Sequence, residues 1–248
     1  MSNLFCGSVQ INDNGSLDQE SNAGTGPRLF KIELGKYCDS IPVISNYLDA
    51  DEMLRANKYR FLKDKNRFII CRGFLKILLA ESTDFNPKDI RIGVGPNKKP
   101  FLPSHPSIFF NVSHSGEYAL IAIGGKHVGV DVEKVDRAFD FSEISPRIFN
   151  SAELEKLDYD SDTKKQFFKF WTRKEAILKA TGKGIDDDLV NIPVTDGFHS
   201  LESGILGDFS DWVVLSFDVD AHHMGALAFK GQKDEYHPNP FFTPLPVF

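Results

Sequence analysis

The sequence lacks several features that identify common classes of protein. Its three cysteines, Cys6, Cys38 and Cys71, are widely separated and form no CxxC pair, so neither a zinc site nor a disulfide framework is expected. It also has no apolar run long enough to cross a membrane, and no secretory signal at its start. We therefore expect a soluble cytoplasmic protein that makes no use of a membrane.

Three motifs of nucleotide and ester chemistry are missing as well. Thr181 to Gly184 contains Gly-Lys-Gly, but a P-loop needs glycine where Ile177 stands and serine or threonine in place of Gly184. No GxGxxG follows an expected strand, which leaves a Rossmann dinucleotide site without support. No GxSxG elbow occurs, and the adjacent residues of Ser113-His114-Ser115 cannot form a Ser-His-Asp triad by themselves.

Positive charge is scarce overall but concentrated in one segment. The net charge of −6 argues against a general nucleic-acid binder. Between Arg55 and Lys76, however, eight basic residues stand against Asp64 alone. Such a segment on an acidic protein predicts a specific anionic ligand or partner, with a solvated helix face as the alternative interpretation.

Hydrophobic periodicity and turn residues predict an α+β protein. Helices are expected over residues 64–81 and 142–149, from Asp49 onward, and from Asn150 onward. Strands are expected over residues 29–34, 109–112, 118–123, 128–133, 189–194, 212–219 and 225–229. An irregular leader (1–26) and an extended proline-rich tail from Pro238 complete the chain.

The order of elements predicts two similar lobes, over residues 27–125 and 126–248. In each, a long helix precedes paired strands, and residues 119–123 (Ala-Leu-Ile-Ala-Ile) resemble residues 225–229 (Gly-Ala-Leu-Ala-Phe). This similarity is an indication of a duplicated fold.

The helix expected around residues 171–181 places charges among apolar side chains. Glu175 and Lys179 are four residues apart and therefore share a face. An ordinary surface salt bridge is one interpretation. The surrounding residues favour another, because buried charges need partners, metals or ligands. These apolar neighbours are Phe167, Phe168, Phe170, Trp171, Ile177 and Leu178.

Two carboxylates alternate on the strand expected over residues 128–133. Asp131 and Glu133 point to the same face, and paired carboxylates suit Mg²⁺ with water and substrate phosphates. Glu175 could supply a third ligand, with Lys174 and Lys179 beside phosphate oxygens. Exposed strand carboxylates without a metal are the alternative interpretation.

Ser113 and His114 are expected at a turn between two strands. Their hydroxyl and imidazole groups could hold a phosphate or a sugar, whereas a purely structural turn is the alternative.

Taken together, three blocks of sequence resemble the Sfp-type 4′-phosphopantetheinyl transferases. They are Phe110 to Ser115, Gly129 to Glu133, and the residues Phe168 to Trp171, Lys174 to Ala176, Lys179, Gly182 and Gly184. The resemblance implies two similar α+β lobes related by a pseudo-twofold axis, with coenzyme A in the cleft between them. It also implies Mg²⁺ bound through Asp131, Glu133, Glu175 and the coenzyme A diphosphate. A chain with this internal symmetry could serve as a monomer, but the sequence leaves the oligomeric state open.

The same resemblance assigns coenzyme A contacts to further residues. Ser113 and His114 match residues near the 3′-phosphate, and Arg67 matches a cationic phosphate contact. Lys174 and Lys179 match lysines near the diphosphate and the pantetheine end, and Asp131 also contacts the ligand. Glu153 stands where family members have an acidic residue. Lys98, Lys99 and Pro100 match the loop beside adenine, although Lys98 replaces the usual glycine.

The implied activity is transfer of the 4′-phosphopantetheine group of coenzyme A to a serine of an apo acyl or peptidyl carrier protein, with release of adenosine 3′,5′-bisphosphate. Glu175 would act as the general base, and Lys179 would stabilise or protonate the leaving group. A Mg²⁺-dependent phosphoesterase or nuclease, or a non-catalytic coenzyme A-binding module, is the alternative. The carrier protein and its biosynthetic pathway stay open.

Overall fold

The computed structural model describes residues 2–11, 26–184, 187–202, 204–206, 211–232, 242, 243 and 245. Its strands are β1 (Ser2–Ser8), β2 (Arg28–Glu33), β3 (Gly93–Val94), β4 (Pro100–Phe101), β5 (Phe109–Ser115), β6 (Tyr118–Gly124), β7 (Val128–Lys134), β8 (Gly197–Leu201), β9 (Trp212–Asp220) and β10 (His223–Lys230). Its α-helices are α1 (Ile41–Ile44), α2 (Ala50–Asn57), α3 (Leu62–Ala80), α4 (Ser145–Ile148), α5 (Ser151–Tyr159) and α6 (Thr163–Thr181).

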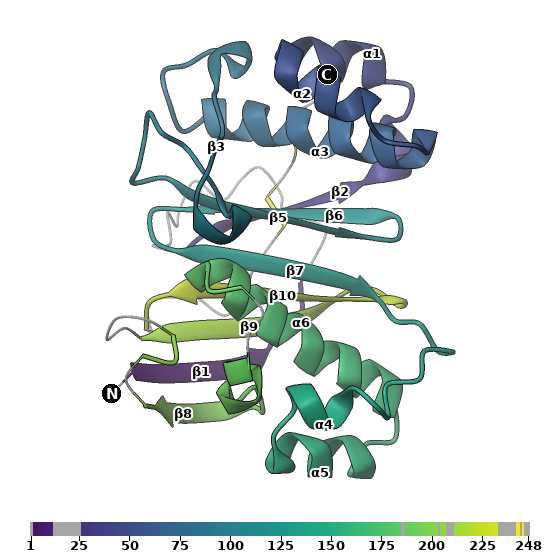
Figure 1. Ribbon diagram of the computed structural model, residues 1–248, viewed down its shortest axis with the longest axis vertical. Helices are drawn as coiled ribbons and strands as arrows, with labels where there is room; N and C mark the ends of the chain where they lie inside the picture. Colours follow the sequence, from purple (N-terminus) through teal and green to yellow (C-terminus); the bar gives the residue numbers. More distant parts are fainter. Residues whose placement is uncertain are drawn as a thin grey trace.

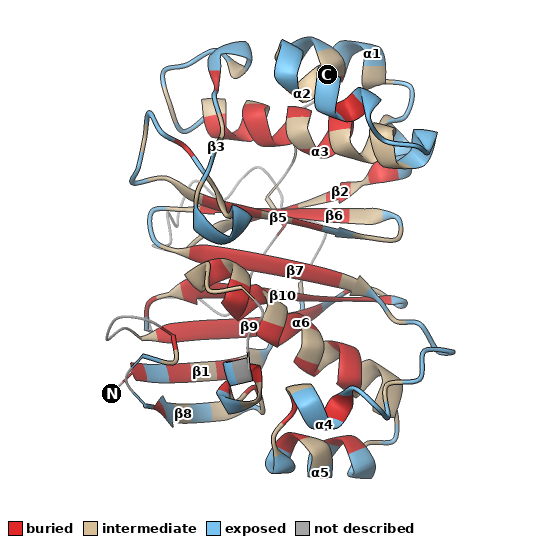
Figure 2. Ribbon diagram, in the orientation of Figure 1, coloured by how far each residue is buried: buried red, intermediate tan, exposed pale blue. Residues whose placement is uncertain are grey.

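The long helix α6 lies against a five-stranded sheet of order β7-β10-β9-β1-β8 (Figure 1). Apolar side chains of α6, such as Phe167 and Ile177, form one cluster with inward residues of the sheet, such as Leu4 and Val214. Figure 2 shows β9 and β10 buried over nearly their whole length, as expected for strands in the middle of a sheet. α6 is therefore fixed along its length by the sheet core.

The second long helix, α3, covers a three-stranded sheet of order β2-β6-β5 (Figure 1). Phe74 and Ile70 of α3 pack on Ile32 and Ile121 of the sheet. The faces turned away from the two helices share a third cluster that contains Leu120 of one sheet and many residues of the other. None of the described helices is both long enough and apolar enough to span a bilayer.

Several sequence predictions are confirmed. α3 and α6 run where amphipathic patterns placed helices, and β2, β5, β6, β7, β9 and β10 cover the expected strands. Asp49 caps α2: its side chain accepts from the Glu52 backbone N–H, and the Glu52 carboxylate accepts from the Asp49 N–H. The mixed α+β class is thus present, and a local capping box marks the start of α2, whereas α3 begins without a side-chain cap.

Four predictions fail. Residues 2–8 of the expected leader form β1, because Leu4 and Cys6 alternate inward while polar Asn3 stays exposed. Residues 189–194 do not form a strand, since residues 187–191 form a 3₁₀ helix. The helix predicted over residues 142–149 is shorter than expected and covers only α4, Ser145–Ile148. Ser113 and His114 belong to strand β5 and not to a turn.

The predicted proline-rich tail falls largely outside the described residues, which exclude Pro238, Pro240, Pro244 and Pro246. Of the described part, Phe242 is buried and forms a parallel bridge with Leu29.

Candidate functional site

The site lies where the edge strand β5 of one sheet runs beside the edge strand β7 of the other. Side chains bond to backbone across this seam: Val130 donates its N–H to Asn111 Oδ1 at 2.9 Å, and Lys134 donates to Ser115 Oγ at 3.0 Å. A seam held in this way keeps polar groups of β5 directed at β7.

Two hydroxyl groups of β5 meet the two predicted carboxylates of β7. Ser113 Oγ donates to Asp131 Oδ1 at 2.8 Å, and Ser115 Oγ donates to Glu133 Oε2 at 2.9 Å. The alternation inferred from the sequence is therefore present, with Asp131 and Glu133 on one face of their strand.

Gly129 brings that same face against α6. A Cβ atom at Gly129 would lie 2.2 Å from the carbonyl oxygen of Ala176 and 2.3 Å from the backbone nitrogen of Ala180. Helix and strand can approach this closely only because the residue is glycine. Since side chains two residues apart share a face, Asp131 and Glu133 also face α6, which carries Glu175 and Lys179.

Asp131 is the most enclosed of the three carboxylates predicted to bind the metal, with 1% of its surface exposed. Its Oδ1 accepts from Lys179 Nζ at 2.5 Å and from Ser113, while its buried Oδ2 has no hydrogen-bond partner among the residues that the structure describes. Burial raises the pKa of Asp131, and the Lys179 ammonium opposes this rise. An unpartnered buried carboxylate oxygen is costly unless a cation or donor completes it.

Glu133 and Glu175 share this electrostatic environment. Burial, followed by the negative charge of Asp131, raises the pKa of Glu133 to about 7. Burial also raises the pKa of Glu175, where Lys179 acts in the opposite direction and Asp131 adds to the rise. The charges of these carboxylates and of Lys179 thus influence one another across β7 and α6, and their grouping in one site stays a prediction.

No group of three or more His, Cys, Asp or Glu side chains, among the residues that the structure describes, is arranged to hold a metal ion. The chemistry of the donors nevertheless fits Mg²⁺, which takes few protein ligands and keeps waters and phosphate oxygens. Asp131 offers its free Oδ2, and Glu133 has a partly buried carboxylate nearby. The metal ligands stay predictions.

A pocket of about 190 Å³ opens between the end of α2, helix α3, β5 and the first residue of β4. It gathers Arg67, Pro100 and His114, three of the residues predicted to contact coenzyme A, and adds Arg55 and Arg72. Burial, and then the charge of Arg67, lowers the pKa of His114. Arg67 itself pairs with Asp64 at 2.8 Å. We call this the basic pocket, and its charge suits an anionic ligand.

Because they are successive residues of a strand, Ser113 and His114 point to opposite faces. Ser113 bonds to Asp131 and Lys179 at the seam, whereas His114 lines the basic pocket. A larger cavity of about 480 Å³ lies beside the first turns of α6, and none of the predicted site residues lines it.

The loop expected beside adenine, residues 97–100, is hydrogen-bonded to the C-terminal end of α6. Lys99 Nζ donates to the Ala180 carbonyl, and Asn97 Nδ2 donates to the Gly182 carbonyl at 2.8 Å. Burial lowers the pKa of Lys99 to about 8. Lys98, which replaces the expected glycine, has φ 61°, in the left-handed region that glycine adopts without cost. Lys98 is exposed and does not line the basic pocket.

The structure contradicts the ligand contact predicted for Lys174. This side chain is fully buried, and its ammonium pairs with Glu153 Oε2 at 3.1 Å. It also donates to the carbonyls of Leu189 and Ile192 at 2.9 and 2.7 Å. Glu153 in turn accepts from the backbone of Val194. A buried ion pair with these extra bonds is structural, because each group satisfies the other.

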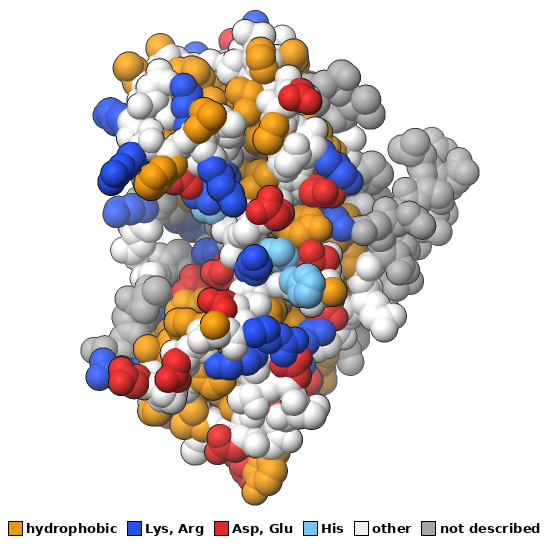
Figure 3. Space-filling view, turned by 90° about the vertical axis from the view of Figure 1, so that its right-hand side faces the viewer, with side chains coloured by type: hydrophobic (Ala, Val, Ile, Leu, Met, Phe, Trp, Pro, Cys, Tyr) orange, Lys and Arg blue, Asp and Glu red, His pale blue; other side chains and the backbone are white. Residues whose placement is uncertain are grey.

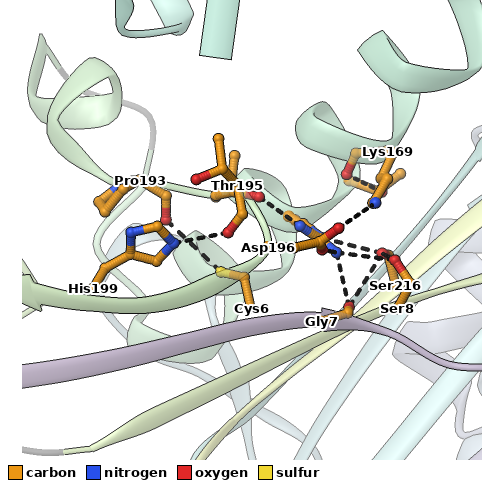
Figure 4. A network of polar contacts seen from close by, with 12 residues as sticks. Cys6, Gly7, Ser8, Lys169, Pro193, Thr195, Asp196, His199 and Ser216 are labelled. Carbon is orange, nitrogen blue, oxygen red and sulfur yellow. Dashed lines mark hydrogen bonds and ion pairs between the residues drawn. The ribbon is translucent and has the colours of Figure 1, made fainter. Parts of the chain in front are cut away.

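Sequence reasoning missed the role of Arg173. Its buried guanidinium donates to the carbonyls of Gly7 and Val194 at 2.8 and 2.6 Å, to Ser216 Oγ at 3.1 Å, and to Asp196 Oδ1 at 2.5 Å. Figure 4 shows Gly7, Ser8 and Ser216 gathered beside Asp196. The only signal in the sequence was a cation within an apolar helix, which did not reveal its partners.

Comparison with known proteins gives consistent findings over both halves of the chain. Residues 127–230 match the model of the 4′-phosphopantetheinyl transferase superfamily, and residues 38–125 match that of the 4′-phosphopantetheinyl transferase N-terminal region.

Individual relatives match most of the chain. A Synechocystis protein provisionally named a 4′-phosphopantetheinyl transferase is 38% identical over 204 residues, which cover 79% of this chain and 80% of that protein. The transferase HetI of Nostoc is 30% identical over 82% of this chain and 87% of its own length. The transferase Sfp of Bacillus subtilis is 25% identical over 73% of this chain and 82% of its own length.

Proposed function

The chain belongs to the 4′-phosphopantetheinyl transferase superfamily and moves phosphopantetheine onto carrier proteins, and we propose that this transfer takes place at the seam of β5, β7 and α6. The observation that carries the proposal is the cluster of Asp131, Glu133, Glu175 and Lys179 beside the basic pocket. The acceptor is the serine hydroxyl of an apo acyl or peptidyl carrier protein, and the second product is adenosine 3′,5′-bisphosphate.

Coenzyme A lies with its 3′-phosphate and adenine in the basic pocket, against Arg67, Pro100 and His114. Three arginines line this pocket and match the charge of the phosphate. The contact of Lys99 with the Ala180 carbonyl holds the loop of residues 97–100 against α6. Lys98 is exposed to solvent on this loop. The diphosphate then reaches the seam, where Ser113 and Lys179 offer donors.

The residues that would hold Mg²⁺ are Asp131, through its free Oδ2, and Glu133 and Glu175 at the same face. Bound there, the ion would shield the negative charge of the diphosphate and polarise its β-phosphate. The protein needs to supply only some of the metal ligands, since phosphate oxygens and water would complete the coordination.

Glu175 takes the proton of the carrier serine as that oxygen bonds to the β-phosphorus of coenzyme A. The bond from this phosphorus to the bridging oxygen breaks, and the electron pair leaves with adenosine 3′,5′-bisphosphate. Lys179 stabilises the charge that develops on the leaving oxygen or donates a proton to it. A carboxylate with a raised pKa suits a general base near neutral pH.

We also propose that the protein is a monomer of two similar lobes related by a pseudo-twofold axis, divided near residues 125 and 126, except that β1 joins the sheet of the second lobe. In support, a 19-residue helix covers each sheet: α3 covers β2-β6-β5, and α6 covers the five-stranded sheet. The seam between β5 and β7 lies where the two lobes meet.

A single incubation tests the function. The protein is mixed with Mg²⁺, coenzyme A and an apo carrier protein, and the carrier is weighed by mass spectrometry while nucleotide products are separated. We expect the carrier to gain one phosphopantetheine group in step with adenosine 3′,5′-bisphosphate. Nucleotide release with an unchanged carrier would indicate a phosphoesterase, and binding of coenzyme A without products would indicate a non-catalytic module.

A further inference from the structure

Two turns from different sheets meet beside Glu133, at the end of the seam. One is the turn at Gly116 between β5 and β6, and the other joins β9 to β10 and ends at His223. In the ladder of β10 and β7, His223 pairs with Lys134, the residue after Glu133. Figure 3 shows histidine side chains in pale blue at mid-height on the side of the molecule that lies at the right in Figure 1, where both turns are found. The proposed chemistry gives no role to His223.

The imidazole ring of His223 is buried and held in one orientation. Its Nδ1 lies 2.9 Å from Asp220 Oδ1, which also accepts from the backbone N–H of His222 at 2.7 Å. Because a carboxylate oxygen only accepts, Nδ1 carries a proton. Tyr118 also bonds to Asp220, and its ring meets the imidazole edge to face, with ring centres 4.9 Å apart. A carboxylate that holds one ring nitrogen fixes the direction of the other, so Nε2 points away from Asp220.

The Nε2 atom of His223 lies directly against the turn between β5 and β6. It is buried and has no hydrogen-bond partner within the described part of the chain. A Cβ atom at Gly116 would lie 2.4 Å from Nε2, and Gly116 has φ 57°, in the left-handed region. Both the backbone conformation and the contact with the ring therefore require glycine at this position. The imidazole edge thus sets how closely the turn approaches β10.

Ser115, the residue before Gly116, connects this turn to the site. Its hydroxyl donates to Glu133 Oε2 at 2.9 Å and accepts from the Lys134 N–H at 3.0 Å. Hydrogen bonds weaken steeply with distance and angle, so a displaced turn would release the Glu133 carboxylate. The basic pocket is less dependent on the turn, because His114 lines it from the opposite face of β5.

We propose that His223, oriented by Asp220, is a positioning residue for the transfer reaction. Its ring holds the Gly116 turn in place, and Ser115 at that turn then fixes the carboxylate of Glu133. This inference rests on the proposed function. A side chain that orients a site carboxylate through an intervening hydrogen bond acts on the rate of the reaction, since small displacements of site groups are costly. Loss of His223 therefore affects the reacting groups at the seam and spares the basic pocket.

The first test compares His223→Ala with His222→Ala, which removes the exposed histidine next to it in the chain. Steady-state transfer to apo acyl carrier protein is measured at varied coenzyme A with Mg²⁺ in excess, well below the melting temperature of each variant. We expect His223→Ala to lower kcat about ten- to a hundredfold while KM for coenzyme A changes less than about twofold. His222→Ala should match the wild type. Equal kcat values for the two variants would overturn the proposal.

Amide hydrogen exchange, in the absence of Mg²⁺ and coenzyme A, measures the positioning without catalysis. The Lys134 N–H bonds to Ser115 near the turn, whereas the Val130 N–H bonds to Asn111 farther along the seam. We expect His223→Ala to accelerate exchange at Lys134 about tenfold and to leave exchange at Val130 unchanged. Unchanged exchange at Lys134 would contradict the proposal. Equal acceleration at both amides would also contradict it, because it would indicate a general loss of stability.

Gly116→Ala disturbs the same contact from the other side and keeps the test decisive if His223→Ala folds poorly. Alone, it should lower kcat and accelerate exchange at Lys134, because the added methyl group meets Nε2. Combined with His223→Ala, that clash is absent, so the double variant should lose less than the product of the two single losses. Normal kcat in Gly116→Ala would overturn the positioning role. Failure of the wild type to transfer would overturn the proposed function instead, and exchange at Lys134 would still test the hold on Glu133.

Discussion

At the scale of single residues, Glu175 is the group on which the proposed proton transfer depends. Glu175→Gln keeps the shape of the side chain but cannot accept the serine proton. We expect a loss of transfer on the order of 10² to 10⁴ fold, typical of a removed general base. The assay is initial-rate labelling of apo carrier, with the melting temperature recorded in parallel. Glu155→Gln on the exposed side of α5 is the control, and near-normal transfer by Glu175→Gln would remove the base assignment.

Glu133 links the site to the pH dependence of stability. Burial and the charge of Asp131 raise its pKa from 4.5 to about 7, so the folded protein holds this proton more tightly than the unfolded chain. Without Mg²⁺, the contribution of Glu133 to the free energy of unfolding is therefore full below pH 4.5 and is lost as pH rises toward about 7. Urea unfolding across this range should show a flatter dependence for Glu133→Gln than for the wild type. An identical slope in both would contradict the raised pKa.

Some site residues were predictable because simple periodicities place them. Alternation along a strand placed Asp131 and Glu133 on one face of that strand. The four-residue spacing of Glu175 and Lys179 placed these two side chains on one face of their helix. The ligand contact predicted for Lys174 was wrong, because a local sequence pattern does not identify partners that are distant in the chain. Its carboxylate, Glu153, lies on α5, and only the folded chain brings the two together. The same limit hid the partners of Arg173.

At the scale of elements, the distance between α6 and β7 decides whether the site can assemble. Gly129→Ala places a methyl group against the helix backbone, which cannot give way as a flexible side chain would. We expect a loss of about 1–3 kcal/mol in unfolding free energy and a marked loss of transfer. Gly125→Ala is a matched control, since a Cβ there meets nothing within 4 Å. Unaltered transfer in Gly129→Ala would show that the contact has no influence on the site.

Elements with local signals were predictable, and those defined by distant pairing were not. Asn150 and Glu153 form the capping box that their spacing indicates. β1 was missed because its short, partly polar sequence has strand character only beside β8 and β9. The apolar residues Leu189, Ile192 and Val194 led to the prediction of a strand over residues 189–194. All three side chains are buried, but a buried segment need not pair with a sheet, and residues 187–191 form a 3₁₀ helix.

At the scale of the whole molecule, Arg173 joins α6 to β1 and β9 through its bonds to Gly7 and Ser216. Arg173→Met removes bonds to two buried carbonyls, and we expect an unfolding free energy lower by about 3 kcal/mol. Transfer at low temperature should persist, because the seam groups are untouched. Urea unfolding and initial rates measure the two effects. Lys169→Met, which removes the other cation near Asp196, should cost less, and equal losses would contradict the central place of Arg173.

The seam itself could not be predicted from sequence. It joins two sheets through side chains of Asn111 and Ser115, and no strand pattern distinguishes such bonds from ordinary surface polarity. The family resemblance supplied the expectation of a cleft, whereas the bonds that shape it required coordinates.

The place of β1 has a consequence for how the chain acquires its structure during synthesis. Leu4 pairs beside Trp212, and Phe5 lies opposite Phe198, so β1 pairs with strands that follow it far along the chain. Pairings of such high contact order close slowly. The β5–β6 hairpin, in contrast, joins strands that follow each other directly. The five-stranded sheet can therefore close only after β8, β9 and β10 have been translated, whereas the sheet β2-β6-β5 can form earlier on the ribosome.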